Sequence, residues 1–109
     1  MLDQLLTITR GFAHCFPEGN DPYQMMTRLL EESGELAQKV NHFEGSGIKR
    51  EKYGQPDPQA LAKEIKDVLI CALQVAVHYG VEAELEATLA LSYQRLKAEG
   101  HIPPETSAQ

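Results

Sequence analysis

Residues 57–80, DPQALAKEIKDVLICALQVAVHYG, decide the fold of this chain. An aspartate followed by a proline is typical of a helix start, because Asp57 can cap the first N–H groups and Pro58 has no N–H to leave unpaired. Gly80 can adopt the left-handed conformation with which many helices end. Between these signals, residues 68–73 are apolar on every side of a helix, which predicts a helix that is buried all round.

Three further helices are expected around this one. The Asp-Pro signal recurs at residues 21–22 and opens a segment that runs to about Phe43, before two nearby glycines. Apolar residues near helical spacing predict a helix over residues 2–15, and another is expected over residues 81–99. No segment has the pattern of a strand. The predicted fold class is therefore all-α, a four-helix bundle that forms a single domain over residues 1–100, followed by a flexible tail over residues 101–109.

The length of the chain bears on its assembly. A chain of 109 residues buries only part of its surface and rarely encloses one helix completely. A second subunit is therefore expected to cover one face of the apolar helix, so that the bundle is completed by dimerisation. Both a homodimer and a dimer of dimers satisfy this expectation.

Composition excludes several classes of partner. With 16 acidic and 10 basic residues, the net charge is −6, and the chain lacks the basic surface that nucleic acids require. No apolar run approaches the roughly 18–20 residues that cross a bilayer, and no signal peptide is recognisable. The two cysteines stand outside any C-x-x-C motif. These observations favour a cytoplasmic protein with reduced thiols and with neither nucleic acid nor membrane as a partner.

Two pairs of carboxylates depart from the pattern of an ordinary bundle. Glu32 and Glu35 are three residues apart on one expected helix, and Glu64 and Asp67 repeat that step on another. If the two helices pack antiparallel, all four carboxylates can converge, and such a cluster implies bound cations. Oxygen ligands select hard ions, so Mg²⁺ is expected, with Mn²⁺ as an alternative. The competing interpretation is that these are solvated acids on amphipathic helices.

Glu31 and Gly34 are neighbours of the first pair in the sequence. Glu31 lies nearly opposite the apolar stripe of its helix, so periodicity places it in water. Gly34 lies within the helix, where glycine costs about 1 kcal/mol relative to alanine. It either lets another helix or an ion approach closely or serves plain helix packing.

The surrounding residues resemble a known family. The pattern Glu32-x-x-Glu35, then residues 36–63, then Glu64-x-x-Asp67 is similar to the E-x-x-E…E-x-x-D signature of MazG-like nucleoside triphosphate pyrophosphohydrolases. These belong to the all-α NTP pyrophosphatase superfamily, together with dimeric dUTPases and phosphoribosyl-ATP pyrophosphohydrolase. The resemblance implies that the four carboxylates hold Mg²⁺ and that a nucleoside triphosphate is split into a monophosphate and pyrophosphate, which removes aberrant or surplus nucleotides. Glu31 matches an additional acid that could accept a proton through water.

The resemblance also suggests substrate contacts. Phe16 and His42 fall where relatives contact the base, although Phe16 could equally pack the helix start and His42 could be a solvated residue at the helix end. Cys71 occupies a place where some relatives have a base-contacting tyrosine. Basic residues that could close over phosphates, or simply be solvated, are Lys49, Arg50, Lys52, Arg95 and Lys97.

Two rival functions remain open. A narrower relative would act on dUTP, dCTP or phosphoribosyl-ATP, and the sequence does not determine the base. A protein of a different class would be a non-catalytic helical module that binds metal or another protein through its acidic face.

Overall fold

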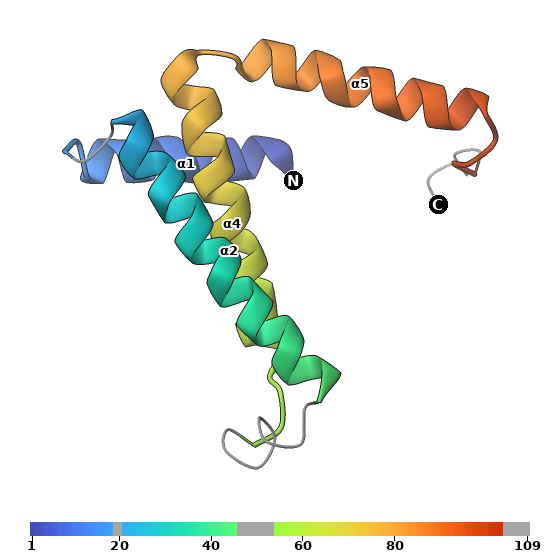
Figure 1. Ribbon diagram of the computed structural model, residues 1–109. Coiled ribbons are helices and arrows are strands. Elements are labelled where there is room, and N and C mark those ends of the chain that lie inside the picture. Colours follow the sequence, from blue (N-terminus) through green and yellow to red (C-terminus); the bar gives the residue numbers. More distant parts are fainter. Residues whose placement is uncertain (19–20, 46–53, 104–109) are drawn as a thin grey trace. The chain divides into compact units, whose positions relative to one another are not determined.

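The computed structural model describes residues 1–18, 21–45 and 54–103. Within these ranges the chain forms the helices α1 (Leu2–Cys15), α2 (Pro22–Glu44), α4 (Pro58–Tyr79) and α5 (Glu82–Ala98), with no strand (Figure 1). The predicted all-α class is confirmed, and each helix lies close to its expected bounds. The expected tail from residue 104 onward and most of the connection between α2 and α4 lie outside the described residues.

The helix ends follow from the residues that mark them. A side-chain oxygen of Asp21 accepts a hydrogen bond from the backbone N–H of Gln24 at 2.9 Å, so the N-terminus of α2 is capped. The Asp57 carboxylate accepts from the N–H of Gln59 at 3.0 Å at the start of α4. Helix α2 ends at Gly45, whose φ of 76° and ψ of 46° are left-handed.

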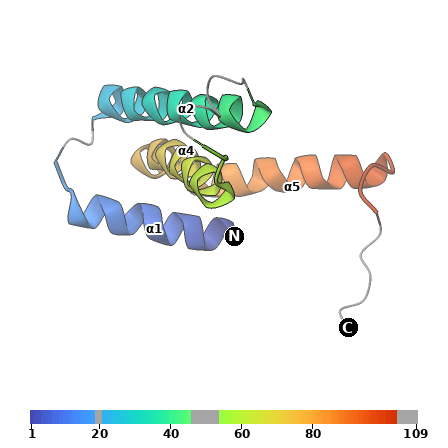
Figure 2. The ribbon, with the colours of Figure 1, turned by 90° about the horizontal axis from the view of Figure 1, so that it is seen from below.

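Helix α4 is the centre of the unit Met1–Tyr79. It packs against α2 on one side and α1 on the other (Figure 2). Helices α2 and α4 run antiparallel side by side, while α1 crosses α4 at a wide angle (Figure 1). The buried apolar side chains come from all three helices: Leu5, Leu6, Met25, Ile70, Cys71, Leu73 and Ala76. This packing fixes the faces that α2 and α4 turn toward each other.

The apolar segment of α4 is not buried all round within this unit; the prediction left one face of the helix for a second subunit to cover. Ile70 and Leu73 are buried, but Ile65 is 43% exposed, Leu69 is 37% exposed and Ala72 is also exposed. The physical reason is that α4 has only two helical neighbours in the unit, so one side of the helix remains open. A groove of about 370 Å³ runs along α1 and α4 there, between Ile8 and Leu69. Dimerisation stays a prediction.

Residues 80–109 form a second compact unit that contains α5. Its helix is followed by Gly100, which has a φ of 81°, and the N–H of His101 donates to the Leu96 carbonyl at 2.9 Å. The Lys97 ammonium lies 5.9 Å from the centre of the Tyr93 ring. Among the residues described in both units, no helix has the length and apolar character needed to span a bilayer.

Candidate metal centre

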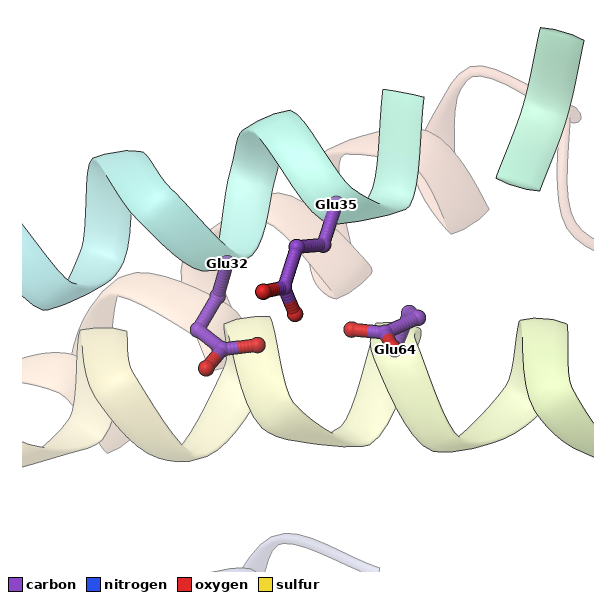
Figure 3. A group of neighbouring side chains, drawn as sticks. All are labelled: Glu32, Glu35 and Glu64. Carbon is purple, nitrogen blue, oxygen red and sulfur yellow. The ribbon is translucent and has the colours of Figure 1, made fainter. Parts of the chain in front are cut away.

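Three carboxylates meet where α2 faces α4. Glu32 and Glu35 reach from α2 toward Glu64 on α4, and their side chains point at one another (Figure 3). One carboxylate oxygen from each residue lies within 4.8 Å of those of the other two. The convergence arises because the two α2 residues share a helix face and the helices pack antiparallel. This places three negative charges around one point.

Burial makes this group unlike a solvated acidic surface. Glu64 is only 7% exposed and Glu32 is half-buried, whereas Glu35 is exposed. The Oε2 atoms of Glu32 and Glu64 are buried and have no hydrogen-bond partner among the described residues. Burying an anionic oxygen without a donor is costly, and a divalent cation is a partner that would offset this cost. An all-oxygen donor set fits Mg²⁺ or Mn²⁺.

The pKa of Glu32 reflects the same crowding. Burial raises the pKa of this carboxyl above its usual value, and the negative charges of Glu35, Asp67 and Glu64 raise it further. Each of these effects disfavours the ionised form. Glu32 therefore releases its proton less readily than an ordinary glutamate, and a bound cation would reverse this tendency.

Asp67, the fourth predicted ligand, is not part of this group. Its carboxylate pairs with Lys63 at 2.8 Å and with Lys66 at 3.4 Å. Partial burial by itself would raise the pKa of Asp67, but the hydrogen bonds and charges of these lysines outweigh it and lower the pKa. Lys63 lies one turn before Asp67 on α4 and provides its nearest positive charge. Asp67 is nevertheless close enough for its charge to act on Glu32.

The other two residues noted near the motif lie outside the group. Glu31 is exposed, in agreement with its expected position opposite the apolar stripe. A Cβ atom added to Gly34 would meet nothing within 4 Å among the described residues. No described helix of this chain therefore requires a glycine at this position.

The comparisons with known proteins agree with this geometry. The family model of the MazG nucleotide pyrophosphohydrolase domain matches residues 20–93, which include all four predicted ligands. The chain belongs to this family. One curated relative, the uncharacterized protein YpjD of Bacillus subtilis (strain 168), is 39% identical over 70 residues, which are 63% of this chain and 60% of that protein. The chain thus matches less than two thirds of the relative's length. No solved structure matches the chain.

The predicted base contact Phe16 of this MazG-family chain lies in the wall of a cavity. Its volume is about 310 Å³, and residues of α1, α2 and α4 also line it. The polar residues in its wall are Thr9, Arg28, Gln74 and His78. Arg28 and Gln74 were not among the substrate contacts predicted from the sequence. The available signal was position, because Arg28 lies one turn before Glu32 and so shares its helix face.

His42 lies at the other end of α2. Its Nε2 atom is 2.7 Å from the carbonyl oxygen of Gly54, where the chain leads back to α4. A second cavity of about 350 Å³ adjoins it, lined in part by Lys39, Phe43 and Asp57. The structure therefore does not bring Phe16 and His42 to one site within the chain.

The remaining predicted substrate contacts belong to different segments of the chain. Cys71 is a buried free thiol of α4, and burial, followed by the charge of Glu32, raises its pKa. Arg95 is exposed on α5, in the second unit. Lys49 and Lys52 lie outside the described residues.

Proposed function

We propose that this protein is a Mg²⁺-dependent nucleoside triphosphate pyrophosphohydrolase, with Mn²⁺ as an alternative ion. The observation that carries the proposal is the group of three carboxylates with two buried, unpaired oxygens. Family membership supports the reaction class. The products are a nucleoside monophosphate and pyrophosphate, and the role is removal of unwanted nucleotides.

The acidic residues divide into ligands of the ion and one proton acceptor in the proposed reaction. Glu32, Glu35 and Glu64 bind the ion, and Asp67 joins them by exchanging its pairing with Lys63. When bound, the ion neutralises the triphosphate and orients the attacking water. Water oxygen then bonds to the α-phosphorus while the bond from that phosphorus to the bridging oxygen breaks, and pyrophosphate leaves. The proton of the water passes through solvent to Glu31, which is exposed.

Some of the proposed substrate contacts are supported by the position of the residue in the structure, and others are not. Phe16 stacks on the base, a role supported by its place in the cavity wall next to α2. Cys71 lies near Glu32, so its side chain can border the same substrate. The proposed contacts of His42 with the base and of Lys49, Lys52 and Arg95 with phosphates rest on sequence position alone.

Assembly and location complete the proposal. A homodimer, or a dimer of dimers, is supported by the apolar side of α4, where Ile65 and Leu69 are exposed. The cytoplasm is the proposed compartment because it contains nucleoside triphosphates and keeps thiols such as Cys15 and Cys71 reduced.

Pyrophosphate release from a panel of ribo- and deoxynucleoside triphosphates tests the proposal. The wild-type protein should release pyrophosphate and monophosphate with Mg²⁺ and neither product with EDTA. Glu64→Gln should lose this activity, while the matched control Glu44→Gln, in an exposed residue at the end of α2, should retain it. A folded wild-type protein that binds Mg²⁺ and cleaves no nucleotide would refute the proposal and favour a non-catalytic metal-binding module.

A further inference from the structure

The cavity that Phe16 lines has the walls of a site for a flat, aromatic ligand. The rings of Phe12 and Phe16 on one wall are stacked, with their centres 6.5 Å apart and their planes 28° from parallel. Met25 and Val77 add apolar surface from α2 and α4. A volume of about 310 Å³ lies at the lower end of the range for small-molecule sites. These features suit a heterocyclic base.

The polar pair in the wall offers hydrogen-bond donors. Arg28 donates from Nη2 to Oε1 of Gln74 at 3.3 Å, and its Nε atom is buried without a partner among the described residues. Because a guanidinium has no acceptor, the Gln74 atom that faces it must be the oxygen. The amide nitrogen of Gln74 therefore remains as a donor. Two neighbouring side chains thus present N–H groups to a ligand.

The position of this pair connects the cavity to the carboxylates. Arg28 precedes Glu32 by four residues on α2, which is about 6 Å along the helix axis. On α4, Cys71 lies three residues before Gln74. The charges of both Glu32 and Arg28 act on the Cys71 thiol. A nucleotide with its phosphates at the metal centre can therefore extend its base into the cavity.

We propose that this cavity holds the base of the substrate and that Arg28 and Gln74 select bases with a carbonyl oxygen over bases with an amino group at the same position. The inference rests on the proposed function. A carbonyl accepts hydrogen bonds from the Arg28 guanidinium and the Gln74 amide, whereas an amino group points its own N–H donors at them and forms neither bond. The protein therefore prefers ITP to ATP and UTP to CTP, pairs that differ in this group and in whether the adjacent ring nitrogen carries a proton.

The ratio of kcat/KM within each pair is the first test. We expect preferences of about 10- to 100-fold, the size of a charge-assisted hydrogen bond gained by one member of the pair and lost by the other. Arg28→Met should bring both ratios close to unity, while Arg10→Met, at an exposed residue of α1 outside the cavity wall, should leave them unchanged. Gln74→Glu replaces a donor by an acceptor and should shift the preference toward CTP. This second variant preserves the test if Arg28→Met does not fold.

Binding separates failure of this inference from failure of the proposed function. Calorimetry with the α,β-imido analogues of dUTP and dCTP, in the presence of Mg²⁺, measures the preference without turnover. If no nucleotide is cleaved but the dUTP analogue binds more tightly and Arg28→Met removes the difference, selection is supported and the reaction is wrong. If nucleotides are cleaved but both analogues bind equally, or the ratio is the same in Arg28→Met, the inference is overturned and the proposed function stands.

Discussion

Neutralising Glu64 should stabilise the metal-free protein and remove its response to Mg²⁺. The carboxylate oxygens of Glu64, Glu32 and Glu35 lie within 4.8 Å of one another. At this separation two negative charges repel by about 3.5 kcal/mol at an effective dielectric constant of 20 and by about 0.9 kcal/mol in water. Glu35 is exposed and Lys63 lies 3.8 Å from Glu64, so the lower half of this range applies. Glu64→Gln should therefore raise the free energy of unfolding in EDTA by about 1–2 kcal/mol.

The Mg²⁺ response has a magnitude of its own. An ion at 100 times its dissociation constant stabilises the folded state by about 2.7 kcal/mol. For a domain of this size, each kcal/mol moves the melting temperature by about 4–8 °C. Wild-type protein should therefore melt about 10–20 °C higher in saturating Mg²⁺ than in EDTA. Without the Glu64 carboxylate, the most deeply buried ligand is lost and this increase should disappear.

Thermal unfolding followed by far-UV circular dichroism measures both effects. The wild type, Glu64→Gln and the control Glu44→Gln are each melted in EDTA and in excess Mg²⁺. Glu44 is exposed and outside the carboxylate group, so its variant should keep the full Mg²⁺ response. An unchanged response in Glu64→Gln, or a lower melting temperature of that variant in EDTA, would refute the reasoning.

Three further predictions concern pH, helix propensity and assembly. Because the pKa of Glu32 is raised above its usual value of 4.5, the free energy of unfolding in EDTA should fall as the pH rises from 4.5 through the raised pKa. Glu32→Gln should flatten this part of a pH series of unfolding curves. Gly34→Ala should raise the free energy of unfolding by about 0.5–1 kcal/mol in urea titrations, because the site is open; a decrease would indicate a close neighbour from another copy. Light scattering should give a dimer for wild type and 12.1 kDa for Leu69→Glu; a monomeric wild type would contradict dimerisation.

The helices could be predicted from sequence because their ends are determined locally. Asp21 and Asp57 cap the residues that follow them, and Gly45 ends α2 in a left-handed conformation, all without any help from distant residues. The convergence of Glu32, Glu35 and Glu64 also followed from spacing, once antiparallel packing was assumed. Local signals and one packing assumption therefore account for the fold class and for the centre of the candidate site.

The side-chain pairings within the site could not be predicted, because they depend on which side chains meet across helices. Arg28 and Gln74 are 46 residues apart, and nothing in either local pattern pairs them. The pairing of Asp67 with Lys63 was available from its spacing of four residues, but sequence does not decide whether a carboxylate turns to a lysine or to other carboxylates. That choice depends on burial and charge, which only the packed helices determine.

The two predicted base contacts, Phe16 and His42, lie toward opposite ends of α2, and their separation constrains where a nucleotide can bind. Phe16 lines a cavity together with Arg28, and His42 lies 14 residues further along α2, so the two are separated by about 21 Å along the helix axis at 1.5 Å per residue. A base in the cavity lined by Phe16 cannot also contact His42 of the same chain. Within one chain, His42 instead contacts Gly54 as the chain returns toward α4. A role for both residues at one base therefore requires His42 to come from a second copy, so the assembly of this protein and its base recognition must be determined together.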